Sequence, residues 1–172
     1  MTMSDPLQGH CLCKTIRVTV SGTPQRTFLC YCPDCQRSAG GPCQAVAAFK
    51  VDKVVLIDMK VADSIPTEEI HRRWIEDPLA FIESAPSLGV YTIEGKDTAS
   101  GFAKPKIFCN ACGCTIATLP MKWGGKIVVI RPNLFDDGLE MESVRLKEEW
   151  FTAHRPSLFS ACEGLTQFET TP

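Results

Sequence analysis

The stretch Cys30–Gly41, CYCPDCQRSAGG, places three cysteines within six residues in the pattern C-x-C-x-x-C. Thiols at this spacing turn toward one point when the backbone bends between them, which is the arrangement of a zinc site. A closed structural zinc site needs four protein ligands, whereas a catalytic site keeps one position for water or substrate. The three thiols of this stretch are therefore one ligand short of a closed site.

Two further cysteine clusters lie outside this stretch. They are Cys11 and Cys13 in GHCLCKTI, and Cys109, Cys112 and Cys114 in FCNACGCTI. Gly113 follows the second thiol of the last cluster and permits the tight turn of a zinc knuckle. Seven or eight clustered thiolates exceed what one zinc ion binds, so we expect two sites, with four and three ligands. Spacing alone leaves open which clusters join.

Composition and the amino-terminal sequence indicate the compartment of the protein and the partners to expect. The chain has 172 residues, ten cysteines, 44% apolar residues and a formal net charge of −2. It has no apolar run long enough for a membrane helix and no signal-like amino terminus, so we expect one soluble, cytoplasmic domain. Neither nucleic acid nor a membrane surface is an expected partner. A reducing compartment favours metal binding over disulfides, although a secreted disulfide framework stays as an alternative.

Three cysteines need separate interpretations. Cys43 and Cys162 stand alone, which suits small buried apolar side chains. Cys114 fits either this interpretation or a metal ligand.

Most of the chain shows strand patterns. Short alternating or apolar runs separated by Gly, Pro and Asp-Gly predict a small antiparallel β protein. These runs are residues 15–20, 45–49, 54–57, 89–95, 115–119, 126–130 and 143–150. We expect both ends, residues 1–6 and 166–172, to be frayed.

One segment has helical periodicity instead. In Ser64–Glu83, Ile70 and Trp74 share a helical face, and Asp77 before Pro78 resembles a cap followed by proline at the first helical position. We expect a short helical insertion over about 60–85, peripheral to a core of about 9–168 within a single zinc-binding domain of residues 1–172. It is either a lid or a surface element packed on the sheet.

The order of the motifs, GHCLCKTI, CYCPDCQRSAGG, FCNACGCTI and then EEWFTAHRPSLF, resembles the glutathione-dependent formaldehyde-activating enzymes, whose domain also occurs in centromere protein V. The resemblance implies a mainly β fold, the β-tent, that holds two zinc ions. It implies a structural site made by Cys11, Cys13, Cys109 and Cys112, and a catalytic site made by Cys30, Cys32 and Cys35. The fourth ligand of the catalytic site is then exchangeable and is the sulfur of glutathione.

The activity that the resemblance implies is that of a carbon–sulfur lyase with glutathione as co-substrate. Zinc bound by three thiolates lowers the pKa of an incoming thiol, and that thiolate adds to an aldehyde carbon or leaves it. Family does not fix substrate, so the electrophile is formaldehyde or a larger one from detoxification or secondary metabolism. This chain has Tyr31 and Gln36 where the family often has His and Arg, with Arg37 one place later.

Few other residues stand out. Arg37 and Arg155 are candidate glutathione-binding residues, while His10, His71 and His154 are interpreted as ordinary surface or packed residues, and Trp150 and Phe151 as core. Two other classes of function remain. One is a non-catalytic, zinc-stabilised binding module whose cysteine triple is closed by Cys43 or Cys114, and the other is a redox-active thiol protein. A homodimer also stays open.

Overall fold

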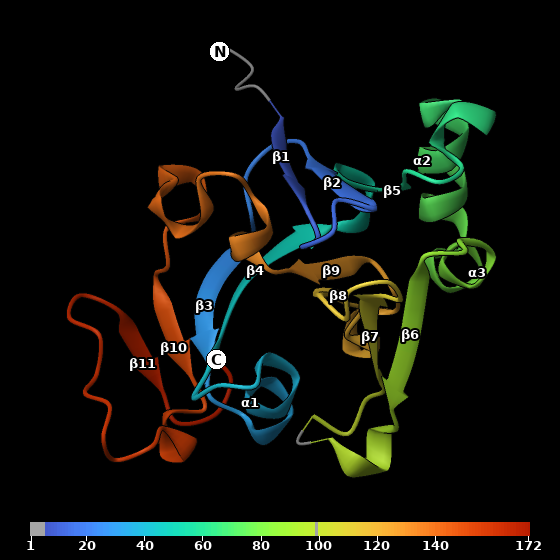
Figure 1. Cartoon of the computed structure of the whole chain (residues 1–172). Coiled ribbons are helices and arrows are strands. Elements are labelled where there is room, and N and C mark those ends of the chain that lie inside the picture. Colours follow the sequence, from blue (N-terminus) through green and yellow to red (C-terminus); the bar gives the residue numbers. More distant parts are fainter. Residues whose placement is uncertain (1–5, 99) are drawn as a thin grey trace.

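The computed structural model describes residues 6–98 and 100–172 as two β-sheets with three α-helices around them (Figure 1). The strands are β1 (Leu7–His10), β2 (Ile16–Val20), β3 (Arg26–Cys30), β4 (Gln44–Lys50), β5 (Val54–Asp58), β6 (Leu88–Ile93), β7 (Lys104–Cys109), β8 (Thr115–Thr118), β9 (Ile127–Ile130), β10 (Glu148–Trp150) and β11 (Thr166–Phe168). The helices are α1 (Pro33–Ala39), α2 (Thr67–Glu76) and α3 (Pro78–Ser84). Short 3-10 turns cover Val51–Lys53, Ala62–Ser64, Gly95–Asp97, Met121–Trp123, Pro132–Leu134, Gly138–Glu140, Glu142–Val144 and Thr152–His154. The predicted mainly β fold is confirmed.

The strands form one small and one large sheet. The small sheet has the order β1-β2-β5, and the large one has the order β11-β10-β3-β4-β9-β8-β7-β6. Pairing is antiparallel except at β10, which runs parallel to both β3 and β11. The predicted antiparallel pairing holds for all other strand pairs of the described residues; β10 is parallel because the chain crosses from β9 past β4 and β3 to reach it.

The two faces of the large sheet belong to different apolar clusters. Strand alternation sends Ala47 and Phe49 of β4 into the main core, where they meet β2 and β5 of the small sheet. Val46 and Ala48 point the other way and join a second apolar cluster with Phe28, Cys30, Cys32, Val129 and Trp150. The cysteine triple thus lies on the face of the large sheet opposite the small sheet.

The helical segment lies where periodicity placed it. The carboxylate of Asp77 accepts hydrogen bonds from the backbone N–H groups of Leu79 and Ala80, so the predicted cap is confirmed. Ile70 and Trp74 are buried against the main core, and Trp74 donates to the backbone oxygen of Val51. None of the helices in the described ranges is long and apolar enough to cross a membrane.

Two sequence predictions about strands need correction. The strand expected over 143–150 contains only β10, since residues 142–144 form a 3-10 turn. The expected fraying of the carboxy terminus is wrong for Thr166–Phe168, because β11 pairs with β10. The fraying expected at the amino terminus falls mostly on residues 1–5, outside the described residues.

Gly9 is required by a close backbone contact beside the first cysteine pair. A Cβ atom built on Gly9 would lie 2.3 Å from the backbone oxygen of Leu134, and Gly9 forms a bridge with Phe135. We expect Gly9→Ala to lower the free energy of unfolding by about 1–3 kcal/mol, because neither backbone can yield without moving a strand. Urea denaturation measures this.

The matched control is Gly41→Ala. Its new Cβ would come no closer than 4.0 Å to another residue. This variant should be neutral or slightly stabilising. Equal stability of the two variants would show that β1 does not need the close approach to the 132–134 turn.

Candidate metal centres

The first candidate centre consists of four cysteines, two from the amino-terminal cluster and two from the last cluster of the sequence. The Sγ atoms of Cys11, Cys13, Cys109 and Cys112 all lie within 4.8 Å of one another. The Sγ atoms of Cys11 and Cys13 are 3.5 Å apart, and those of Cys13 and Cys109 are 3.7 Å apart. A tetrahedron of Zn–S bonds of about 2.3 Å has edges of about 3.8 Å, so this donor set fits zinc.

Two tight turns aim these thiols at one point. In the first turn the backbone N–H of Lys14 donates to Cys11 O, and that of Ile16 donates to Cys11 Sγ at 3.2 Å. In the second turn Gly113, with φ of 70°, donates from its backbone N–H to Cys109 O. The Ile16 N–H stabilises the Cys11 thiolate, and the positive φ at residue 113 favours glycine.

The environments of the four thiols differ. Burial raises the pKa of Cys11 to about 12 and also raises that of Cys109. Cys13 is exposed, and its hydrogen bond with the Thr15 hydroxyl lowers its pKa to about 6. Thiols of such different acidity become equivalent anionic ligands only when a cation compensates their charge.

The second candidate centre is the cysteine triple of Cys30, Cys32 and Cys35. Their Sγ atoms also lie within 4.8 Å of one another, and Cys30 and Cys32 are 3.3 Å apart. Cys30 ends β3, Cys32 is the N-cap of α1, and Cys35 lies in the first turn of that helix. Pro33 at the first helical position begins the helix directly after the strand. The strand-to-helix corner therefore gathers the three thiols.

The cysteine triple opens into a cavity of about 750 Å³, which we call the basic cavity. Five basic side chains and one acidic side chain line it, namely Arg26, Lys104, Lys106, Lys122, Arg131 and Asp34. Phe28, Trp123, Trp150, Phe151 and His154 also line it. Phe28 and Trp150 stack at 3.7 Å between ring centroids. Trp150 and Phe151 are therefore cavity wall as well as core, which corrects part of their sequence interpretation.

Two cations stand beside the thiols without a carboxylate partner among the described residues. They are Lys106 and Arg131, both buried. Burial lowers the pKa of each, while the neighbouring thiolates of the cysteine triple act in the opposite direction. Hydrogen bonds from Cys30 and Cys32, and then the charges of Lys106 and Arg131, lower the pKa of Cys35. The site is arranged to hold negative charge.

The remaining cysteines stay outside both clusters. All ten are free thiols. Cys43 and Cys114 are half-buried and Cys162 is exposed, so the interpretation as a small buried apolar side chain is wrong for Cys162 and holds only in part for Cys43. Neither Cys43 nor Cys114 joins the cysteine triple. Closure of the triple by either of them therefore has no support.

Neither of the two predicted glutathione-binding arginines lines the basic cavity. Arg37 is exposed on α1 and does not line the basic cavity. The Arg155 guanidinium donates to Glu149 at 3.3 Å and to Gln167 at 2.9 Å, and lies over the Tyr31 ring. Binding of glutathione by these two residues stays a prediction.

The family model described as glutathione-dependent formaldehyde-activating enzyme matches residues 6–72. The predicted resemblance is confirmed. The formaldehyde-activating match includes Cys11, Cys13 and the whole cysteine triple, whereas Cys109 and Cys112 lie beyond it.

Two further comparisons accompany this match. No curated protein matches the chain. The crystal structure of a Rhodobacter sphaeroides protein is similar at 12% sequence identity, with a TM-score of 0.48, and the similarity covers 76% of this chain and 88% of that one.

Sequence reasoning missed a buried carboxylate behind the cysteine triple. Glu149 is 0% exposed and accepts hydrogen bonds from the Tyr31 hydroxyl, the Gln167 amide, the Cys162 backbone N–H and Arg155. It fastens the loop of the cysteine triple to the carboxy-terminal segment. The EEW motif gave one weak signal, since its strand alternation points Glu149 away from Trp150.

We expect Glu149→Gln to lower the free energy of unfolding by about 2–4 kcal/mol at pH 7, because four donors would face a neutral amide. Although burial by itself raises the pKa of Glu149, its hydrogen bonds outweigh that effect and the pKa is lowered. A carboxylate favoured in this way stabilises the fold above its ordinary pKa of about 4.3, and the contribution disappears as pH falls through the folded value. As pH falls from 7 to 3, the free energy of unfolding of Glu149→Gln should therefore decrease less than that of the unmodified protein.

Urea denaturation between pH 3 and pH 7 tests this expectation. Glu163→Gln, at an exposed position, is the control and should behave as the unmodified protein. A variant Glu149→Gln with unchanged stability at pH 7 would contradict the structural importance of the network.

Proposed function

We propose that this chain is a zinc-dependent enzyme that forms or cleaves carbon–sulfur bonds in glutathione adducts of an aldehyde or another electrophile. The single observation that carries the proposal is the cysteine triple, three protein thiols that face a large basic cavity. The matched family's description as glutathione-dependent supports the choice of thiol. In this proposal Cys30, Cys32 and Cys35 are the catalytic ligands.

The charges of the cavity suit an anionic thiol. Glutathione carries two carboxylates and one ammonium group, and its thiolate adds a further negative charge. Lys104 pairs with Asp34 at 3.2 Å and Arg26 pairs with Glu148 at 2.9 Å, which leaves Lys106, Lys122 and Arg131 available to the ligand. Zinc, when bound, supplies a Lewis acid that keeps the incoming sulfur as thiolate near neutral pH. Lys106 and Arg131 offset the negative charge that the thiolate brings into a site of low polarity.

The reaction balances without a further reagent. The thiolate sulfur donates an electron pair to the carbonyl carbon, the C=O π electrons move to oxygen, and that oxygen takes up, through solvent, the proton that the thiol released, which gives the hydroxyalkyl thioether. In the reverse direction the hydroxyl loses its proton and the C–S bond breaks. The aromatic side chains of the basic cavity, Phe28, Trp123, Trp150 and Phe151, offer an apolar surface on which the aldehyde can lie near the sulfur.

Nuclear magnetic resonance exchange spectroscopy tests the function. We expect zinc-loaded protein to accelerate exchange between free glutathione and its formaldehyde adduct, and protein depleted of zinc by a chelator to lose the effect. A panel of larger aldehydes then identifies the electrophile. If the zinc-loaded protein accelerates exchange with none of them while it binds zinc at both clusters, the alternative of a non-catalytic binding module takes precedence.

A further inference from the structure

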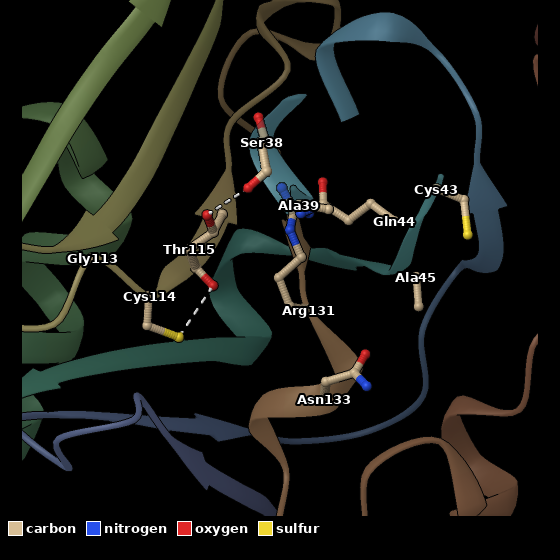
Figure 2. A pocket seen from close by; sticks show the side chains of 10 residues that line it. All are labelled: Ser38, Ala39, Cys43, Gln44, Ala45, Gly113, Cys114, Thr115, Arg131 and Asn133. Atoms are coloured by element: carbon tan, nitrogen blue, oxygen red, sulfur yellow. Dashed lines mark hydrogen bonds between the residues drawn. The ribbon is translucent and has the colours of Figure 1, made fainter. Parts of the chain in front are cut away.

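A second cavity, of about 390 Å³, shares Arg131 with the basic cavity, and Figure 2 shows the side chains that line it. We call it the Arg131 cavity. Its lining is Ser38, Ala39, Cys43, Gln44, Ala45, Gly113, Cys114, Thr115, Arg131 and Asn133, which includes one cation and no acidic side chain. Helix α1 lies between the two cavities, because Asp34 lines the basic cavity and Ser38 lines the Arg131 cavity. An ion pair of Asp34 with Lys104 and a hydrogen bond from the Thr115 hydroxyl to Ser38 O attach the helix to β7 and β8.

Arg131 belongs to the walls of both cavities. Its side chain is 6% exposed, and Nη2 donates to the Thr118 hydroxyl at 2.8 Å. Nε and Nη1 are buried without a hydrogen-bond partner. A buried guanidinium with two free donor atoms is costly to keep, and an oxyanion would satisfy these atoms with charge-assisted hydrogen bonds.

Gln44 supplies the complementary group. It is also 6% exposed, and its Oε1 atom is buried without a donor. The register pairs Gln44 with Cys30, so both side chains leave the same face of the sheet as direct neighbours. Arg131 follows Val129 by two residues, and Val129 lies on that face as well. The Arg131 cavity therefore presents a free cationic donor and a free acceptor next to the cysteine triple.

We propose that the Arg131 cavity binds an α-amino-acid group, with its carboxylate on Arg131 and its ammonium group on Gln44 Oε1. Carboxylate and ammonium groups on one carbon match the two unsatisfied side chains, and the cavity is large enough to admit them. The γ-glutamyl end of glutathione carries this group, and in that form the inference rests on the proposed function. A free amino acid is the other source of the same chemistry.

Calorimetric titration with thiol-free probes tests this binding separately from the metal. S-Methylglutathione keeps the γ-glutamyl group but cannot bind as a thiolate. S-Methylcysteinylglycine lacks that group, and free glutamate has it alone. We expect the protein to bind S-methylglutathione at least about tenfold more tightly than S-methylcysteinylglycine, a difference of about 1.4 kcal/mol.

Variants assign the difference to the two residues. Arg131→Gln should abolish the preference, and Gln44→Leu should reduce it severalfold. Arg17→Gln removes an exposed charge on β2 and should leave the preference unchanged. If Arg131→Gln does not fold, the Nε–Hε resonance of Arg131 in unmodified protein gives the same information, because it should shift as S-methylglutathione is added.

The outcomes separate the two proposals. Arg131-dependent binding of glutamate without that of S-methylglutathione would support the cavity with a free amino acid as its ligand. Probe binding that ignores Arg131, or no binding of any probe, would overturn the inference. Binding of the glutathione thiol itself is followed independently by the absorption of cobalt-substituted protein, and its absence would count against the proposed function alone.

Discussion

Cys109→Ser is expected to unfold the protein or leave it insoluble. Its thiol belongs to the four-cysteine cluster that joins β1–β2 to β7–β8, and Cys13 and Cys109 are 96 residues apart in sequence. A structural zinc site contributes about 10–16 kcal/mol in small zinc domains, which is comparable to the whole stability of a typical domain, about 5–15 kcal/mol. Because the site closes a long loop, its loss also raises the conformational entropy of the unfolded chain, which favours unfolding.

Circular dichroism and zinc analysis of purified protein measure the effect. Cys114→Ser is the matched control, since Cys114 lies in the same turn, is half-buried and stays outside the cluster. The control should fold and keep its zinc. A folded Cys109→Ser protein with unchanged zinc content would refute the structural assignment of the four-cysteine cluster.

Cys32→Ser is expected to abolish glutathione-dependent activity while the fold persists. The cysteine triple is local in sequence, so its loss frees little chain entropy. Cys32 is also the N-cap of α1, without a side-chain capping bond, and serine is a favourable residue at that position. We expect the loss of one zinc per chain and a destabilisation of about 1–2 kcal/mol, or a fall in melting temperature of about 2–8 °C.

Three measurements on one sample separate the interpretations: zinc content, melting temperature and the exchange rate of the formaldehyde adduct. Cys162→Ser, at an exposed cysteine outside both clusters, should match the unmodified protein in all three. Collapse of Cys32→Ser to the same extent as Cys109→Ser would make the triple structural. Unchanged turnover in Cys32→Ser would contradict catalysis through the cysteine triple.

The sequence by itself determined the local features of this protein. The clustered cysteines at residues 11–13, 30–35 and 109–114 indicated two centres, because seven or eight thiolates exceed what one zinc ion binds, although spacing alone did not say which clusters join. Periodicity located Ile70 and Trp74 on one helical face, and Asp77 capped the next helix as its residue type and the following proline predict. These features depend on neighbours within a few residues.

Tertiary structure alone decided what depends on distant partners. Strand β11 forms because β10 pairs with it; Thr166 and Phe168 favour strands, but a segment of three residues becomes a strand only beside a partner. From the sequence, Glu149 is an ordinary strand glutamate. In the structure it is buried, and one of its hydrogen-bond donors, the Tyr31 hydroxyl, lies 118 positions away in the sequence. Arg131 becomes an unpaired buried cation only when β4, β9 and α1 assemble around it. Burial and charge pairing are sums over the packed chain, so no local pattern contains them.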